Sequence, residues 1–215
     1  MTAISLGSVT EVLEKHTSVY RHRPPVYQTV MLTDLASVWS GHHSNVLDIG
    51  GGTGVMAEAM QALLSVDSVT AIDVVDRYFE DLSVETRVYD GATLPFDDDA
   101  FAAATINNVI HHVPIEARGG LMSEIRRVVK GPIYIKDHVA RSRLDHARLT
   151  TLDAIGNIPF GGQIGARYLT MNDWKSLAGG AGYRIAATST GRYRRGPMAW
   201  LFPNRLEIAF RLDRA

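Results

Sequence analysis

Apolar residues recur at helical spacing through the first part of the chain, over Val9–Trp39. The run Arg23-Pro24-Pro25 interrupts this stretch. Proline lacks a backbone donor and clashes with the preceding helical turn, so a helix ends before it. The pattern therefore predicts two helices, one on each side of the prolines.

From Asn45 onward, short apolar runs alternate with segments of helical periodicity. Apolar strands linked by helices are typical of a parallel sheet that is covered on both faces. Right-handed connections then give a doubly wound α/β fold. The expected strands are Val46–Ile49, Ser68–Asp73, Val84–Tyr89, Phe101–Ile106 and Ile133–Lys136, with Tyr183–Ser189 and Arg205–Leu212 as two further candidates. The expected helices are Val55–Leu64, Ile115–Val129 and Leu144–Ile155. We therefore expect a mostly parallel, seven-stranded sheet.

The chain shows no internal repeat and no low-complexity linker. We therefore expect one domain over residues 1–215, in which a helical segment, 1–44, precedes an α/β core, 45–215. A length of 215 residues suffices to bury a substantial core.

Composition excludes several classes of function. With 22 Lys and Arg against 23 Asp and Glu, the formal charge is −1, which gives no bulk attraction to nucleic acid or to an anionic membrane. The absence of cysteine removes disulfides, thiolate zinc sites and a cysteine nucleophile. No secretory signal and no membrane-spanning apolar run is evident, so we expect a cytoplasmic protein.

A glycine-rich turn follows the first expected strand. The sequence Gly50-Gly51-Gly52-Thr53-Gly54 separates that strand from a helix beginning near Val55. Glycine permits positive φ angles and lets a ligand approach the backbone. In doubly wound sheets this turn lies where ligands bind. A tight turn without a ligand is the alternative, but four glycines in five positions exceed what a turn needs.

The spacing narrows the choice of ligand. A dinucleotide-binding fingerprint needs a glycine where Val55 stands, and a P-loop needs Gly-Lys-Ser/Thr. The observed Gly-x-Gly-x-Gly, with Asp48 two residues before it, resembles motif I of the class I S-adenosylmethionine-dependent methyltransferases. The resemblance implies a Rossmann-like methyltransferase fold. It also implies that Asp48 holds the amino group of the cofactor and that its methionine part lies against Gly50, Gly51, Gly52 and Gly54.

Three further segments resemble that family in the same order. Asp73 ends the second expected strand, where a carboxylate can accept hydrogen bonds from both ribose hydroxyls, and the resemblance places Val74 in the same site. Capping of the next helix is the alternative role for Asp73, although Asp76 is better placed for it.

The third segment, Tyr89–Phe101, contains Asp90, which the resemblance assigns to the adenine amino group. Gly91, standing where the family commonly has alanine, is assigned a backbone contact. The fourth segment, Thr105–Pro114, resembles motif IV and implies that Asn107 lies near the sulfonium. The resemblance covers Asn45–Asp137. It specifies S-adenosylmethionine far more closely than it specifies the acceptor.

The resemblance implies a methyltransferase, and we expect an oxygen or nitrogen atom of a small molecule as acceptor. One alternative is a protein that binds S-adenosylmethionine but catalyses a non-methylating reaction or serves as a non-catalytic subunit. A nicotinamide oxidoreductase is disfavoured by the missing glycine. We expect no metal, because the acidic run Asp97–Asp99 has no His or Glu beside it and suits a solvated turn.

Removal of a proton from the acceptor would call for a base, and histidine has a suitable pKa. His138 follows the fifth expected strand and is our first candidate; His112 is the second, and His111 is the third. A structural role for each is the alternative. Neighbouring residues of a strand point to opposite faces, so we do not expect Asp137 to orient His138 directly.

Candidate acceptor contacts come from two regions. Asp153 and Asn157 are spaced i to i+4 on one helix face, although Asn157 could instead cap the helix. The N-terminal helices form a lid in many members of the family, and on them Tyr20, Arg23 and Tyr27 are candidates.

The segment Gly191–Gly196 holds three arginines and suits a solvated loop better than a nucleic-acid site, which needs several phosphate contacts. We therefore expect a small-molecule acceptor, no nucleic acid and no membrane. A homodimer is compatible with all of this.

Overall fold

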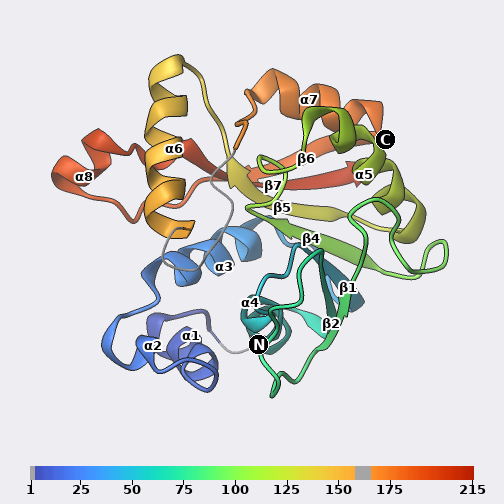
Figure 1. Cartoon of the computed structure of the whole chain (residues 1–215), viewed down its shortest axis with the longest axis horizontal. Coiled ribbons are helices and arrows are strands. Elements are labelled where there is room, and N and C mark those ends of the chain that lie inside the picture. Colours follow the sequence, from blue (N-terminus) through green and yellow to red (C-terminus); the bar gives the residue numbers. More distant parts are fainter. Residues whose placement is uncertain (1–2, 158–165) are drawn as a thin grey trace.

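The computed structural model describes residues 3–157 and 166–215 (Figure 1). Its strands are β1 (His43–Ile49), β2 (Val66–Asp73), β3 (Glu85–Val88), β4 (Ala103–Asn107), β5 (Ile133–His138), β6 (Tyr183–Ser189) and β7 (Glu207–Arg214). Its α-helices are α1 (Leu6–Leu13), α2 (Val19–His22), α3 (Val26–Val38), α4 (Val55–Leu63), α5 (Ile115–Val128), α6 (Arg143–Asn157), α7 (Met171–Gly180) and α8 (Gly196–Leu201). A short 3₁₀ helix, Asn204–Leu206, precedes β7.

The strands form one seven-stranded sheet in the order β3-β2-β1-β4-β5-β7-β6. The first five strands in this order pair in parallel, and β7 is antiparallel to both of its neighbours. The prediction of a doubly wound, mostly parallel sheet is confirmed. The chain leaves β1 toward β2 on one side and returns to β4 on the other, so the crevice at the carboxyl ends of β1 and β4 is the switch point of the sheet.

Helices cover both faces of the sheet (Figure 1). On one face, apolar residues of α1, α3 and α4 form a buried cluster with β1 and β2. On the other face, α5 and α7 supply Leu121, Ile125 and Trp174 to a second cluster. Burial on both faces explains why the central strands read as nearly continuous apolar runs.

Part of the N-terminal segment packs directly on the sheet. Helix α3 packs on β5, β6 and β7, and it buries Leu32, Leu35 and Val38 there. Strand β1 begins at His43, inside the segment expected to be entirely helical. The division into a lid, 1–44, and a core, 45–215, is therefore not a division into separate layers, because α3 belongs to the helical layer of the core.

Two elements near the C-terminus were not expected from the sequence. Helix α7 begins at a capping box in which Thr170 and the Asp173 side chain exchange hydrogen bonds. Helix α8 is six residues long and follows the arginine-rich segment. Helix α8 is too short to show a clear periodicity, and the capping box was the available signal for α7.

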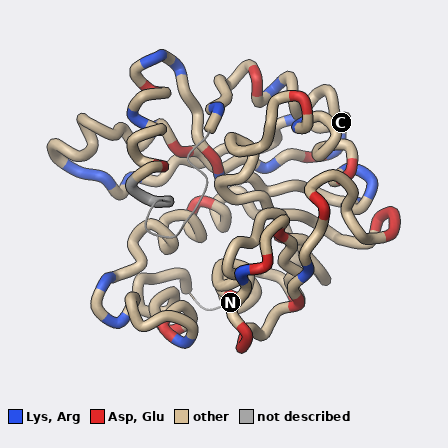
Figure 2. The backbone as a smooth tube through the Cα atoms, in the orientation of Figure 1, with Lys and Arg blue, Asp and Glu red and all other residues tan. Residues whose placement is uncertain are grey.

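None of the helices in the described residues combines the length and the apolar character needed to cross a bilayer. Basic and acidic residues are interspersed along the described chain (Figure 2).

A buried ion pair joins β5 to β7. Lys136 Nζ lies 2.9 Å from Glu207 Oε2, and the two side chains are 0% and 4% exposed. Arg194 pairs with the other oxygen of Glu207, and the Tyr193 hydroxyl donates to that oxygen at 2.7 Å. The segment Gly191–Gly196 was expected to be a solvated loop. Two of its side chains, those of Tyr193 and Arg194, instead point inward and bind Glu207 at the start of β7.

Removing Glu207 should leave the buried Lys136 without its counter-charge. We expect Glu207→Ala to lower the free energy of unfolding by about 3–5 kcal/mol, measured by urea denaturation. Glu85→Ala is the matched control, because the Glu85 side chain is 55% exposed in its pair with Arg87; its effect should stay below about 0.5 kcal/mol. Equal effects of the two substitutions would contradict a structural role for the buried pair.

Candidate functional site

The carboxyl ends of β1, β2 and β4 meet at one edge of the sheet. Ile49 of β1 is in register with Ile72 on one side and with Ile106 on the other. The residues that follow these positions therefore emerge side by side. They include the glycine-rich turn, Asp73 and Asn107.

The glycine-rich turn is bare on one side and tightly packed on the other. Gly52 has a φ of +60°, and a Cβ atom built there would meet no described atom within 4 Å. A Cβ atom on Gly51 would instead lie 2.8 Å from the Cβ of Ala71. The backbone N–H of Gly52 donates to Asp73 Oδ2 at 2.8 Å. A ligand can thus lie against the turn at Gly52, while packing and the Asp73 hydrogen bond hold the turn in place.

Asp48 is buried beneath this turn. Its Oδ1 atom accepts hydrogen bonds from Thr105 Oγ1 at 2.7 Å and from Asn107 Nδ2 at 3.2 Å. Burial raises the pKa of Asp48 to about 7, although these two hydrogen bonds act in the opposite direction. The Oδ1 atom of Asn107 is buried and has no hydrogen-bond partner among the described residues. The Oδ1 atom of Asn107 is therefore a hydrogen-bond acceptor that has no donor within the described part of the switch point.

Asp73 and Val74 lie on the far side of the turn. Besides the bond to the turn, Asp73 accepts one from the Val75 N–H at 3.1 Å, and the residue is only 4% exposed. Val74 is half exposed, and its Cγ1 atom lies 3.2 Å from where a Cβ of Gly91 would stand. Segments 73–75 and 90–91, which are separate in the sequence, are therefore neighbours.

Asp90 is exposed, and its Oδ1 atom accepts hydrogen bonds from the N–H groups of Ala92 and Thr93, both at 2.8 Å. These two backbone bonds, with that of Thr93 the stronger, lower the pKa of the Asp90 carboxyl. Asp90 thus shapes its own turn beside Val74, in addition to any contact with a ligand.

These residues fit S-adenosylmethionine. The open backbone at Gly52 suits the amino-acid part, and the unpaired Asn107 oxygen suits a positively charged donor. The Asp73 carboxylate at the end of β2 suits the hydroxyl groups of a ribose, and the exposed Val74 offers an apolar wall beside Gly91. An unpaired buried acceptor costs about 1–3 kcal/mol, which a donor on the ligand would recover.

A histidine cluster lies at the same edge of the sheet, over β4 and β5. His111 follows β4, and its Nδ1 atom donates to Asp137 Oδ1. The other ring nitrogen of His111 lies 3.5 Å from Asp153 Oδ2. Burial alone would lower the pKa of His111, but the carboxylates of Asp137 and Asp153 raise it to about 9. Burial would likewise raise the pKa of Asp137, but His111 holds it far below its usual range.

His138 is the last residue of β5 and lies beside His111, with 4.9 Å between the ring centroids. Its Nδ1 atom is 3.6 Å from Asp137 Oδ1, which is longer than a hydrogen bond. The side chain of Asp137 is instead taken up by His111 and by backbone N–H groups. His112 Nε2 lies 3.8 Å from Asp153 Oδ2. The structure thus brings all three candidate histidines together around Asp137 and Asp153.

The structure places the other candidate acceptor contacts at different locations. Asp153, on α6, belongs to the histidine cluster and accepts a hydrogen bond from the Tyr168 hydroxyl at 2.7 Å. The side chain of Asn157 lies outside the described residues. The Tyr20 hydroxyl accepts a bond from Gln28 Nε2 at 2.9 Å, and Arg23 is exposed at the end of α2.

Among the candidates on the N-terminal helices, Tyr27 is the one that reaches the strand ends. Its hydroxyl accepts a hydrogen bond from Asn108 Nδ2 at 2.8 Å. Its ring lies 5.8 Å from Lys136 Nζ. Helix α3 places Tyr27 here because it packs on the sheet. Tyr20 belongs to α2, which precedes α3 in the chain.

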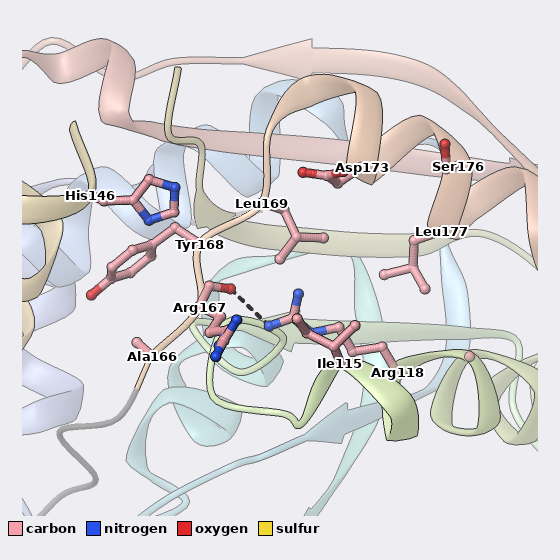
Figure 3. Close-up of a pocket in the computed structure, with 11 residues that line it drawn as sticks. Ile115, Arg118, His146, Ala166, Arg167, Tyr168, Leu169, Asp173, Ser176 and Leu177 are labelled. Carbon is pink, nitrogen blue, oxygen red and sulfur yellow. Dashed lines mark hydrogen bonds between the residues drawn. The ribbon is translucent and has the colours of Figure 1, made fainter. Parts of the chain in front are cut away.

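A cavity of about 610 Å³ lies between α5, α7 and the segment 166–169 (Figure 3). Arg118 crosses its floor and donates to the backbone oxygen of Arg167 at 2.8 Å. Tyr168 and His146 point toward each other at one end (Figure 3). The ring of Tyr168 also stacks on His111, with 5.3 Å between the centroids. Tyr168 is therefore shared by the cavity and the histidine cluster.

Sequence reasoning missed Tyr168, Thr105 and Lys136 in this region. Thr105 lies two residues before Asn107, so its side chain points to the same face of the strand and reaches Asp48. That alternation was an available signal. Tyr168 and Lys136 gave no such signal, because their partners come from distant parts of the chain.

The comparisons with known proteins agree with this geometry. Residues 46–131 match a family model described as a methyltransferase domain. A putative methyltransferase of Haloferax volcanii, solved in complex with the Trm112 methyltransferase activator, is similar in structure, with a TM-score of 0.65 and 14% identity over 97% of this chain and 94% of that chain. No curated protein sequence matches this chain.

Two further solved structures are similar. One is an S-adenosylmethionine-dependent methyltransferase of Thermotoga maritima, described as a possible histamine N-methyltransferase, with a TM-score of 0.63 and 14% identity over 98% of this chain and 100% of that chain. The other is the magnesium protoporphyrin IX methyltransferase of Synechocystis, solved with S-adenosylhomocysteine, with a TM-score of 0.55 and 18% identity over 97% of this chain and 84% of that chain.

The matched range, residues 46–131, includes the glycine-rich turn, Asp73, Asp90 and Asn107. The similar structures share the overall fold of this chain. The chain therefore contains a methyltransferase domain over residues 46–131, and the residues at its switch point fit S-adenosylmethionine as the cofactor.

Proposed function

We propose that this methyltransferase transfers the methyl group of S-adenosylmethionine to an oxygen or nitrogen atom of a small molecule. One observation carries the proposal: β4 ends in Asn107 at the cofactor crevice and continues within four residues to His111 in the histidine cluster. The cofactor residues and the cluster of titratable side chains are therefore built on the same strand end. A methyl donor and an acceptor held at these two places would be adjacent.

The cofactor-binding set in this proposal consists of Asp48, the glycines of the turn, Asp73, Val74, Asp90, Gly91 and Asn107. Asp48 and Asn107 hold the amino group, since both present oxygen atoms at the switch point. Asp73 accepts hydrogen bonds from the ribose while it keeps its bond to Gly52. Val74 and Gly91 border the adenine.

Bound S-adenosylmethionine supplies an electrophilic methyl group on a positively charged sulfur. The acceptor's lone pair forms the new bond to carbon as the carbon–sulfur bond breaks, and that pair of electrons stays on sulfur. The residues of the chain contribute by alignment and by excluding water. The acceptor's proton passes to a neighbouring group, for which His138 is our first choice and His112 the second. His111 is less accessible, because its side chain is 0% exposed and both ring nitrogens face carboxylates.

The cavity at Tyr168 supports a small-molecule acceptor. Its volume of about 610 Å³ is within the range of small-ligand pockets. It is lined by both apolar and polar side chains, among them Leu177, Ile115, Arg118 and Asp173. Tyr168 lies between this cavity and the histidine cluster, because its ring stacks on His111 and its hydroxyl donates to Asp153. A homodimer and a cytoplasmic location remain expectations.

Incubation of the protein with methyl-labelled S-adenosylmethionine and fractionated metabolite extracts tests the proposal. We expect label to move to a small molecule. Binding of S-adenosylmethionine without any transfer, to extracts or to protein fractions, would favour the alternative of a non-methylating or non-catalytic role. Absence of calorimetric binding of both S-adenosylmethionine and S-adenosylhomocysteine to the folded protein would refute the assignment of the cofactor site.

Replacing Asp73 should weaken cofactor binding. We expect Asp73→Ala to cost about 1.5–3 kcal/mol for each charge-assisted hydrogen bond to the ribose, measured by isothermal titration calorimetry with S-adenosylhomocysteine. Asp76→Ala is the matched control, because Asp76 belongs to the following turn and is exposed. Unchanged affinity in the Asp73 variant would remove this residue from the ribose role.

Cofactor affinity should rise with pH because of Asp48. Its pKa is about 7 in the free protein, and a positively charged amino group favours the ionised carboxylate, so binding lowers this pKa. Affinity should therefore be retained above pH 7 and fall below it, by about tenfold between pH 8 and pH 6. Calorimetry with S-adenosylhomocysteine over this range measures the effect. Asp48→Asn should bind more weakly with a flat profile; a wild-type profile as flat as that of the variant would contradict the role.

Replacing His138 should affect turnover rather than the cofactor. With an acceptor in hand, we expect His138→Ala to lower kcat by about 10²–10⁴-fold and to leave the Kd for S-adenosylhomocysteine unchanged. His42→Ala serves as the control, because the His42 side chain is 56% exposed and lies at the opposite end of β1. Wild-type turnover by the His138 variant would end this assignment.

A further inference from the structure

Three metal-ligating side chains converge at the histidine cluster. His111 follows β4, His138 ends β5 and Asp153 lies on α6. One donor atom from each residue lies within 4.8 Å of the other two. Within the described residues, this is the one group of at least three such side chains that lie close enough together to hold a metal ion.

Two ring nitrogens in this group have no hydrogen-bond partner. His111 Nε2 and His138 Nδ1 are both buried and unpaired among the described residues. The side chains of these residues are 0% and 9% exposed. The nearest acidic oxygens lie 3.5 Å from His111 Nε2 and 3.6 Å from His138 Nδ1, whereas a charge-assisted hydrogen bond measures about 2.7–2.9 Å. Buried ring nitrogens that neither donate nor accept call for a ligand between them.

The surrounding residues orient these donors. Asp137 accepts a hydrogen bond from His111 Nδ1, which turns the Nε2 atom of that ring toward Asp153. Asp137 is itself held by the N–H groups of Ile110 and His138, at 3.1 and 2.7 Å. A carboxylate behind a ligating histidine is the usual second-sphere arrangement of metal sites, where it fixes the tautomer of the ring. The Tyr168 hydroxyl positions Asp153 in the same way, at 2.7 Å.

We infer that His111 Nε2, His138 Nδ1 and the carboxylate of Asp153 bind one divalent transition-metal ion. Two imidazoles and one carboxylate suit zinc, iron, manganese, cobalt or nickel, whereas magnesium and calcium prefer oxygen donors. The ion would also balance the carboxylates of Asp137, which is buried, and Asp153, which is partly buried. From the sequence we expected no metal, because the acidic run Asp97–Asp99 has no His or Glu beside it. The three donors proposed here are far apart in the sequence, so no local pattern indicated them.

Three protein ligands leave coordination positions for an exogenous oxygen or nitrogen atom. In this part the inference rests on the proposed function: the ion would hold the acceptor beside the cofactor crevice and make its proton easier to lose. His138 then acts as a ligand rather than as a base. A loss of turnover in His138→Ala agrees with either role, so metal binding has to be measured directly.

The test is metal binding by the full chain after treatment with a chelator. Calorimetric titration with Zn²⁺, Mn²⁺ and Co²⁺ should show one ion bound per chain, and Co²⁺ should develop the visible absorption of a nitrogen- and oxygen-ligated site. Mg²⁺ should bind far more weakly. The inference would be overturned if the wild-type protein bound none of these transition metals. In that case His111 would carry a proton and no metal.

Variants locate the ion. Asp153→Asn keeps an acceptor for Tyr168 and should weaken metal binding by about 100-fold, as should His138→Ala; Asp137→Asn should weaken it by about 10–100-fold through His111. His42→Ala should bind as the wild type does. Equal metal affinity in wild type, Asp153→Asn and His138→Ala would place the ion elsewhere and refute the site.

Binding of S-adenosylhomocysteine by each variant reports separately on the fold and on the proposed function. Metal binding lost with cofactor binding intact supports the site in a folded protein. Cofactor binding absent in the wild type would refute the proposed function, while the metal titration would still decide this inference.

Discussion

The parallel pairing of β1 with β2 and β4 is the constraint on which the rest of the structure depends. Because parallel strands share a direction, the residues that follow Ile49, Asp73 and Ile106 emerge at one edge. The chain turns away on opposite sides of β1, so the crevice between β1 and β4 is the switch point of the sheet. Backbone hydrogen bonds in the sheet thus place a glycine turn, a carboxylate and an amide together at this edge.

This edge of the sheet is unusually polar for its burial. Asp48 meets Thr105, Lys136 meets Glu207, and Asp137 meets His111, each across neighbouring elements. Apolar side chains could fill the same volume without the desolvation cost that buried charges carry. The polar pairs therefore contribute less to stability than to fixing the orientation of groups that a ligand would contact. The unpaired atoms, Asn107 Oδ1 and the two ring nitrogens, lie where a ligand would complete the pairing.

Strand β4 links the two halves of the site. Asn107 belongs to the cofactor crevice, and Asn108, with a φ of 57°, turns the chain toward His111. Asn108 also bonds to Tyr27 of α3, so a helix of the N-terminal segment buttresses the turn. The N-terminal segment therefore acts on the site through packing on the sheet.

The sequence by itself determined the α/β class, the order of the strands along the chain, the glycine turn and the cofactor type. These depend on local patterns: apolar runs, glycine spacing, and an acidic residue at a strand end. It did not predict α7 or α8, although the capping box of α7 was an available signal. Only the tertiary structure decided that His111, His138 and Asp153 share one centre, that Lys136 pairs with Glu207, and that Tyr20 turns to Gln28. Such contacts join residues from 8 to 71 positions apart, and their geometry depends on register and packing that no local pattern encodes.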